Sequence, residues 1–274
     1  MLENTILVDE IDNDTLVSMI KMAYAFENWE KVISLSDDLL EMSAPKNKKM
    51  SMKKPLVYYF GYSHLMKGLA LQKLKNYKES MACVHIYSDL NWLDNSQEGK
   101  YYIDSFQTFA KANSLTLELL MGDRNKLTEY LDILIKNPDE ILPGLITIIE
   151  SSLVHNFDVD KEISLLLPYI SEYSHQNRPV RVAYYLTVHY LVALYYYKKK
   201  KYSDAIVCTL HNITESDKLS NDRYFKRSIA LFDVLKSHAS VPQMAEYSDT
   251  LHLILRRVIE NEEDFDFDSV IGFN

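Results

Sequence analysis

The chain has 274 residues, of which 47% are apolar, and its formal net charge at pH 7 is −9. Six glycines and seven prolines are too few for the frequent turns of an all-β protein or for a long disordered segment. The acidic charge argues against direct nucleic-acid binding, which depends on lysine and arginine side chains that neutralise phosphates.

Apolar residues that recur every three or four positions predict twelve helices along the chain. Some have clear start signals: Asn137-Pro138-Asp139-Glu140 places a cap, a first-turn proline and two acids at the positive end of a helix. Pro168 lies inside one predicted helix and should kink it or begin it anew. The predicted helices span residues 14–27, 29–42, 56–74, 76–90, 98–121, 123–136, 138–155, 159–174, 179–198, 202–214, 221–237 and 241–260.

Short polar breaks separate several of these helices in pairs. Four of the breaks look alike: Glu27-Asn28-Trp29, Lys75-Asn76-Tyr77, Gly122-Asp123-Arg124 and Lys200-Lys201-Tyr202. Their spacing, with one more break near Asn156-Phe157-Asp158, predicts a repeat of roughly 35 to 48 residues. About six helical hairpins fit the chain at that period.

Two of the hairpins fit the tetratricopeptide register. In such a unit a small residue in the first helix lets the second helix approach, an aromatic residue fills the bend, and a further small residue seats the second helix. The matching residues are Gly68, Leu71, Tyr77 and Ser80 in one hairpin, and Ala193, Tyr196, Tyr202 and Ala205 in the other. The sequence therefore predicts an all-α fold, a right-handed superhelix of about six hairpins that forms a tetratricopeptide-like α-solenoid. A non-repetitive helical bundle is the alternative.

The predicted domain organisation has three parts. Residues 1–12 are an N-terminal extension, residues 13–260 form the repeat domain, and residues 261–274 are an acidic and aromatic C-terminal tail. The tail reads NEEDFDFDSVIGFN, and two interpretations stay open. Its acids predict a mobile segment, whereas its apolar residues predict docking against the last hairpin.

Motifs for catalysis or metal binding are missing from the sequence. It has no Gly-rich phosphate loop, no HExxH and no CxxC, and the acids around Asp158-Val159-Asp160 lack the glycine and glutamate of a calcium loop. We therefore predict a protein that is not an enzyme and holds no cofactor and no metal. An effector that supplies one catalytic residue to another protein would leave no motif, so this alternative stays open.

The location follows from cysteine use and hydropathy. Cys83 and Cys208 lie in separate predicted helices, as expected in a reducing compartment. No signal peptide is visible, and no apolar run reaches the roughly 18 residues of a membrane span. We therefore expect a cytoplasmic protein. A lysine cluster at Lys46, Lys48, Lys49, Lys53 and Lys54 is interpreted as a solvated loop, with an acidic partner or nucleic acid as the alternative.

Tyrosine is over-represented, with 20 copies, and many fall on the helix faces that would line a groove. The first helix of each hairpin in a helical solenoid lines the concave surface. A groove with aromatic walls, amide donors and cationic ends suits an extended peptide or a partner helix. The predicted binding residues on this register are Tyr62, Leu65, Gln72, Lys73, Thr187, Tyr190, Tyr197, Arg223 and Arg227. The alternative is that these tyrosines pack between helices.

Several strings also suggest a family. They include Pro55-Leu56-Val57-Tyr58-Tyr59-Phe60-Gly61-Tyr62-Ser63-His64, Tyr87-Ser88-Asp89-Leu90, Phe109-Ala110-Lys111-Ala112-Asn113 and Leu142-Pro143-Gly144-Leu145. Over about residues 12–240 the chain resembles the C-terminal helical domain of Xre-type helix-turn-helix regulators of spore-forming Gram-positive bacteria. That domain is distantly similar to the tetratricopeptide sensor domains of peptide-pheromone receptors.

The resemblance implies a regulatory module that binds a short peptide or a partner protein and that forms a homodimer. It adds Asn113 as a possible counterpart of the asparagines with which such receptors hold a peptide backbone. The family's helix-turn-helix has no counterpart here, because the chain opens with MLENTILVDEIDN and goes straight into the first hairpin. Direct DNA binding is therefore not expected of this chain. A dimerisation or protein–protein interaction scaffold without a small ligand is the alternative.

Overall fold

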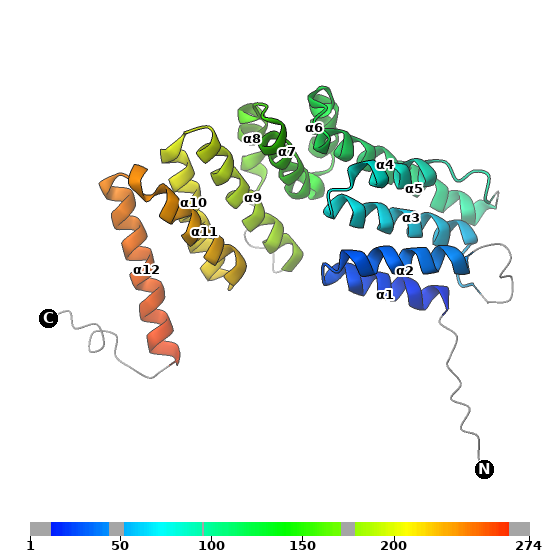
Figure 1. Cartoon of the computed structure of the whole chain (residues 1–274), viewed down its shortest axis with the longest axis horizontal. Coiled ribbons are helices and arrows are strands. Elements are labelled where there is room, and N and C mark those ends of the chain that lie inside the picture. Colours follow the sequence, from blue (N-terminus) through cyan, green and yellow to red (C-terminus); the bar gives the residue numbers. More distant parts are fainter. Residues whose placement is uncertain (1–11, 44–51, 95, 171–178, 263–274) are drawn as a thin grey trace, which may run out of the picture. The chain divides into compact units, whose positions relative to one another are not determined.

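The computed structural model describes residues 12–43, 52–94, 96–170 and 179–262 (Figure 1). Throughout these ranges the secondary structure is helical, with no strand, which confirms the all-α prediction. The chain divides into two compact units, Met1–Tyr130 and Leu131–Asn274, called unit 1 and unit 2 below. Residues 1–11 of the predicted extension, residues 263–274 of the predicted tail, and Lys46, Lys48 and Lys49 lie outside the described residues.

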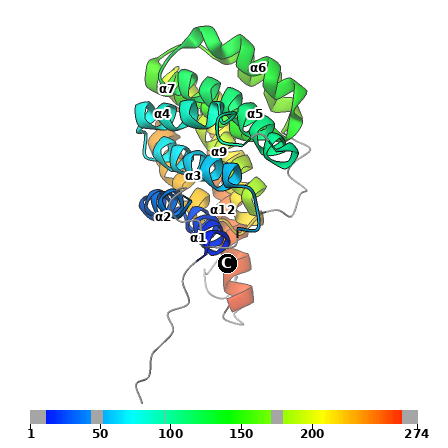
Figure 2. The same cartoon turned by 90° about the vertical axis from the view of Figure 1, so that its right-hand side faces the viewer.

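Unit 1 consists of helices that follow one another in chain order in both views (Figures 1 and 2). Each helix packs against the next from α1 to α5, and α3 also contacts α1 and α5. The helices are α1 (Asn13–Ala25), α2 (Trp29–Met42), α3 (Leu56–Lys73), α4 (Tyr77–Ser88) and α5 (Gln97–Leu120). A 3₁₀ turn at Arg124–Lys126 then leads into α6 (Leu127–Lys136), within which the division between the units falls.

Unit 2 follows a similar order. Helix α7 packs against α8 and α9, α9 against α10 and α11, and α10 against α11 and α12. The helices are α7 (Ile141–His155), α8 (Asp160–Leu166), α9 (Pro179–Lys198), α10 (Tyr202–Lys218), α11 (Asp222–Leu235) and α12 (Val241–Glu262). Single 3₁₀ turns lie at Pro138–Glu140, Leu167–Tyr169 and Lys236–His238.

The predicted helix boundaries agree closely with the observed ones, and α2 and α9 match at both ends. Two differences have local causes. The helix predicted over 159–174 leaves α-helical geometry after Leu166, because Pro168 cannot donate an intrahelical hydrogen bond. Helix α10 runs on to Lys218 instead of ending at 214, and the buried side chains of Ile213 and Ser216 hold its last turn in place.

The four alike breaks all have one backbone geometry. At each break a residue with positive φ ends the helix, and two hydrogen bonds close the turn in the pattern of a Schellman motif. At the first break, for example, the Glu27 N–H donates to Tyr24 and the Asn28 N–H donates to Ala23. The residues with positive φ that carry this pattern are Glu27, Lys75, Gly122 and Lys200, and Ser220 adds a fifth case after α10. One turn type therefore recurs along the chain.

Gly68 allows α3 and α4 to approach closely. A Cβ atom added at Gly68 would lie 3.2 Å from the Cβ of Cys83 and 3.6 Å from the backbone oxygen of Ser80. The Ser80 hydroxyl donates a hydrogen bond to the Gly68 carbonyl at 2.7 Å. In unit 2, Ala193 and Ala205 occupy the equivalent positions and are fully buried. The small residues therefore lie where the register predicted a close helix contact.

Two buried tyrosines anchor neighbouring hairpins in the same way. The Tyr59 hydroxyl accepts the Lys54 backbone N–H at 3.2 Å and donates to Asp14 at 3.1 Å. The Tyr195 hydroxyl accepts the Val159 N–H at 3.1 Å and donates to Asp160 at 3.0 Å. Burial, reinforced by the neighbouring carboxylate, raises the pKa of each hydroxyl to about 12. Some of the many tyrosines therefore stabilise the packing between helices.

Candidate functional site

Helices α9 and α11 bring four side chains together on one face of unit 2. The rings of Tyr190 and Tyr224 lie 6.1 Å apart in an edge-to-face arrangement. The guanidinium of Arg227 sits 5.9 Å from the Tyr190 ring centre and 5.5 Å from the Tyr224 ring centre. The hydroxyls of Thr187 and Tyr224 are hydrogen-bonded to each other. We call these four residues the Arg227 face.

Helical periodicity explains why these residues meet. Thr187 and Tyr190 are three positions apart on α9, and Tyr224 and Arg227 are three positions apart on α11, so each pair shares one side of its helix. The N-terminal end of α11 is capped by Asn221, whose side chain accepts the Tyr224 N–H at 3.2 Å. The cap fixes the first turn of α11 and thereby the position of the Tyr224 ring.

Arg227 is exposed, and within the part of the chain that the structure describes its guanidinium has two cation–π contacts but no hydrogen bond or ion pair. No described carboxylate forms an ion pair with it, whereas the neighbouring Lys226 lies 3.9 Å from Asp222. A cation–π contact engages the charge of a guanidinium without occupying its five N–H donors. Those donors match a carboxylate, a phosphate or the carbonyl groups of a bound peptide.

Three residues of the Arg227 face, Thr187, Tyr190 and Arg227, belong to the predicted binding set. Arg223, also predicted, is exposed one turn before Arg227 on α11. Tyr224 was missed, although its spacing from Arg227 was a usable signal. Tyr197 lies in the last turn of α9, about 10 Å along the helix axis from Tyr190, and its ring is 6.0 Å from that of Tyr202.

The predicted residues of unit 1 do not gather into one cluster. Tyr62 is half-buried and stacks on Tyr58 at 5.7 Å, and burial raises the pKa of its hydroxyl. Leu65 packs against the core of α3, α4 and α5. Gln72 and Lys73 lie at the other end of α3, about 15 Å along the helix axis from Tyr62.

Asn113 has a structural contact. Its side-chain amide donates to the hydroxyl of the buried Tyr87 at 2.8 Å. This bond links α5 to α4 and satisfies a phenol inside the helix packing. The observed partner of Asn113 is therefore a core tyrosine.

Unit 1 has its own aromatic cluster with a cation, which the sequence reasoning missed. The Lys54 ammonium lies 4.0 Å from the Tyr58 ring centre and 6.0 Å from that of Tyr102. The Tyr58 and Tyr102 rings are 5.1 Å apart. Lys54, Tyr58 and Tyr102 are all half-buried, so this cation is largely enclosed by its own chain. We call these three residues the Lys54 cluster.

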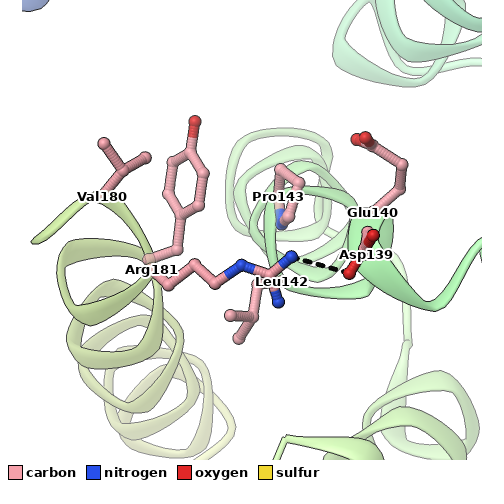
Figure 3. A pocket seen from close by; sticks show the side chains of 7 residues that line it. Asp139, Glu140, Leu142, Pro143, Val180 and Arg181 are labelled. Atoms are coloured by element: carbon pink, nitrogen blue, oxygen red, sulfur yellow. Dashed lines mark hydrogen bonds and ion pairs between the residues drawn. The ribbon is translucent and has the colours of Figure 1, made fainter. Parts of the chain in front are cut away.

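A pocket of about 420 Å³ lies between the start of α7 and the start of α9 (Figure 3). Arg181 reaches across it to Asp139, with a distance of 2.6 Å between the guanidinium and the carboxylate. Burial and the nearby Glu140 raise the pKa of the Tyr184 hydroxyl. The lining residues are Asp139, Glu140, Leu142, Pro143, Val180, Arg181 and Tyr184. The cation of this pocket is already paired, unlike Arg227.

Two histidines meet between α9 and α10. The rings of His189 and His211 lie 4.5 Å apart, and the Tyr185 hydroxyl is 2.9 Å from His211 Nε2. Burial, followed by the nearby His211, lowers the pKa of His189 to about 3. Within the described ranges, no group of three or more His, Cys, Asp or Glu side chains is arranged to hold a metal ion.

No protein-family model, curated protein or solved structure matches the chain. The resemblance to Xre-type regulators therefore stays a prediction. Among the helices of the described residues, none combines the length and the apolar character that crossing a membrane requires.

Proposed function

We propose that the chain is a regulatory binding module that recognises a short peptide or a segment of a partner protein, and that the Arg227 face is its main contact point. The observation that supports this most is the exposed guanidinium of Arg227, which lies within cation–π distance of two tyrosine rings and has no described carboxylate partner. Tyrosine and arginine are the residues that most often dominate binding energy at protein interfaces.

The repeat architecture supports the same proposal. We infer a right-handed, tetratricopeptide-like superhelix from the recurring turn after α1, α3, α5 and α9 and from the small residues Gly68 and Ala193. In that architecture α9 and α11 are the first helices of consecutive hairpins and line the concave surface. The Arg227 face then lies in the groove, where an extended peptide would run across both helices.

The regulatory part of the proposal rests on the resemblance to Xre-type regulators. Such a module would act in the cytoplasm by binding a peptide or protein that carries the signal. This role requires no catalytic residue, cofactor or metal from the chain itself.

A peptide library tests the binding proposal. Phage-displayed random heptapeptides are selected on the full chain, and the affinity of the selected peptides is measured by fluorescence anisotropy. We expect Arg227→Gln to weaken binding at least tenfold, because the bidentate donors are lost. The matched control is Lys226→Gln, which removes an exposed cation from the preceding position on α11 and should change affinity less than twofold. Equal affinities for the two variants would contradict the proposal.

A dimerisation scaffold is the second candidate, because α12 exposes an apolar stripe. Its residues follow one another at alternating steps of three and four, the heptad spacing of paired helices. They are Val241, Met244, Ser248, Leu251, Leu255 and Val258, and Val241, Met244, Leu255 and Val258 are 85%, 40%, 40% and 41% exposed.

The stripe is self-complementary when two copies run antiparallel. Val241 then faces Val258 of the second copy, Met244 faces Leu255, and Ser248 faces Leu251. Leu255→Arg should therefore convert a dimer to a monomer in light scattering coupled to size exclusion. Leu253→Arg is the matched control, because Leu253 is 68% exposed but lies off the stripe. A monomeric wild-type chain would remove this candidate.

A further inference from the structure

The pocket at Arg181, between the start of α7 and the start of α9, has the size and the mixed lining of a small-ligand site. Its volume of about 420 Å³ falls within the range of about 300–1,000 Å³ that is usual for such sites. Leu142, Pro143 and Val180 supply apolar walls, and Tyr184 supplies an aromatic ring. The pocket can therefore accommodate an apolar group with a charged group beside it.

The charged residues of the lining leave one carboxylate available. Arg181 and Asp139 form an ion pair with a distance of 2.6 Å. Figure 3 shows the Glu140 carboxylate apart from this pair. Glu140 is exposed, and its side chain forms no hydrogen bond or ion pair with a described residue. A ligand in the pocket therefore meets a carboxylate that can bind a cation.

Tyr184 adds a phenol next to this carboxylate. Burial, followed by the charge of Glu140, raises the pKa of the Tyr184 hydroxyl, which shows that the two groups lie within electrostatic reach of each other. Tyr184 is half-buried, and its hydroxyl forms no hydrogen bond with a described residue. A phenol oxygen accepts a hydrogen bond, and a tyrosine ring attracts a cation over its face. Glu140 and Tyr184 therefore offer two kinds of contact to the same cation.

A primary ammonium fits these groups better than other charged ligands do. It has three N–H donors and no acceptor, and its hydrogen bond to a carboxylate is strengthened by charge. An anion is disfavoured, because Arg181 is already paired and Glu140 would repel it. A divalent metal ion would need about six oxygen ligands, which is more than these side chains supply.

Helix α9 connects this pocket to the Arg227 face. Tyr184 lines the pocket, whereas Thr187 and Tyr190 belong to the Arg227 face, and the three residues follow one another at steps of three along α9. Side chains three positions apart are neighbours on a helix surface. Tyr184 and Tyr190 lie about 9 Å apart along the helix axis. About three residues of an extended peptide cover that distance.

We propose that the pocket at Arg181 is a subsite in which Glu140 and Tyr184 bind a primary ammonium group of the peptide whose carboxylate binds Arg227. The inference rests on the proposed binding function, and it names the chemistry of the partner. The partner is a peptide that carries a primary ammonium and a carboxylate at least about three residues apart. The ammonium is that of its free N-terminus or of a lysine side chain.

A fluorine label inside the pocket tests the subsite in the full chain. Tyr184 is replaced by 3-fluorotyrosine, and its fluorine NMR signal is followed during titration with leucinamide, which has an ammonium but no carboxylate for Arg227. We expect leucinamide to shift the signal, whereas the uncharged N-acetylleucinamide should not. An equal shift with both compounds would overturn the proposal.

Two variants of the labelled chain identify the carboxylate responsible. Glu140→Gln should weaken leucinamide binding at least fivefold. The matched control is Glu246→Gln, which removes an exposed carboxylate of α12 outside the pocket lining and should change affinity less than twofold. Equal affinities for the two variants would overturn the proposal.

A third compound distinguishes the two sources of the ammonium. N-acetyllysinamide carries its ammonium on the side chain alone. Binding of leucinamide alone assigns the subsite to a free N-terminus, and binding of N-acetyllysinamide alone assigns it to a lysine side chain. If neither compound moves the signal, the proposal is wrong.

The subsite and the binding function fail in different ways. If an amine binds through Glu140 but no library peptide binds through Arg227, the subsite stands and the peptide-binding function of the Arg227 face is wrong. If library peptides bind through Arg227 and neither amine moves the signal, the subsite is wrong and the binding function stands. If both bind, Glu140→Gln should also weaken the selected peptides at least fivefold, and an unchanged affinity would show that the pocket and the Arg227 face bind different ligands.

Discussion

Each unit contains a cation over two tyrosines, and the two clusters use the cation differently. In unit 1 the half-buried Lys54 ammonium lies 4.0 Å from the Tyr58 ring centre. In unit 2 the exposed Arg227 guanidinium lies 5.5 Å from the Tyr224 ring centre. The rings around the half-buried ammonium shield it from a ligand, whereas the exposed guanidinium still has its N–H donors available for a ligand.

The difference teaches that residue composition alone does not make a site. Both clusters combine tyrosines with one cation, so residue types alone would predict the same role for both. In the Lys54 cluster the contact between the Tyr58 and Tyr102 rings packs the start of α3 against α5. In the Arg227 face the N–H donors of the guanidinium are available to a ligand. We therefore interpret the first cluster as part of the fold and the second as a recognition surface.

The largest expected effect concerns the close helix contact that both units share. Gly68→Leu places a branched side chain where a Cβ alone would be 3.2 Å from Cys83. Overpacking of this kind costs about 1–3 kcal/mol or more of the free energy of unfolding. Ala193→Leu should act in the same direction in unit 2, because Ala193 is fully buried at the equivalent position.

Urea denaturation followed by two signals separates these effects. The two tryptophans of the chain, Trp29 and Trp92, both belong to unit 1, so their fluorescence reports on that unit, whereas circular dichroism reports on both. Gly68→Leu should shift the fluorescence transition to lower urea. An unchanged transition would show that α3 and α4 do not need the small residue.

The next effect compares two buried phenols. Tyr195→Phe leaves the buried Val159 N–H without its acceptor, which should cost about 1–3 kcal/mol of the free energy of unfolding. Tyr87→Phe in unit 1 removes the acceptor of the Asn113 amide, which is only partly buried and can turn toward water. Its expected cost is about 1 kcal/mol or less. Denaturation midpoints of both variants test the ranking, and a larger loss for Tyr87→Phe would reverse it.

Most helices and turns could be predicted from the sequence because their signals are local. Caps, prolines and apolar periodicity gave α2 and α9 at both ends. The breaks at Glu27, Lys75 and Lys200 were recognised as alike, although none has the glycine that usually marks a left-handed turn residue. The polar residues and helices on either side of each break, more than the type of the left-handed residue, indicated that the turns are alike.

The site could be predicted only in part, because it depends on which helices pack together. Periodicity placed Thr187 and Tyr190 on one face of α9, but the Thr187–Tyr224 bond joins residues 37 positions apart. The Lys54–Tyr102 contact and the pocket at Arg181 also join distant segments. A single sequence identifies a helix face without identifying what covers it. The resemblance likewise suggests Asn113 as a peptide contact without showing its observed partner, Tyr87.

The stability of the two units at low pH should depend on two buried histidines, His189 in unit 2 and His64 in unit 1. Burial lowers the pKa of both imidazoles, that of His189 from 6.5 to about 3. Below pH 6.5 the unfolded chain takes up a proton at residue 189 that the folded chain does not take up until about pH 3. The free energy of unfolding should therefore fall as the pH drops through that window, by up to about 1.4 kcal/mol per pH unit.

Variants identify the group responsible. His189→Gln should flatten the pH dependence of the denaturation midpoint between pH 6.5 and 4, relative to the wild type. His211, Tyr185 and Glu215 face the same region and stay unchanged in this variant. His64→Gln serves as the comparison in unit 1. If both variants keep the full wild-type slope, carboxylates elsewhere control the acid sensitivity.

The smallest effect on stability separates the two clusters most sharply. Lys54→Met removes an enclosed cation and should lower the free energy of unfolding of unit 1 by about 0.5–1 kcal/mol. Arg227→Gln should cost less than about 0.5 kcal/mol, because the guanidinium is exposed and no described carboxylate depends on it. Binding of library-selected peptides should show the opposite order, with a large loss for Arg227→Gln and none for Lys54→Met. If Arg227→Gln instead destabilises unit 2 as much as Lys54→Met destabilises unit 1 while peptide affinity is unchanged, both clusters are structural and the recognition surface has to be sought elsewhere.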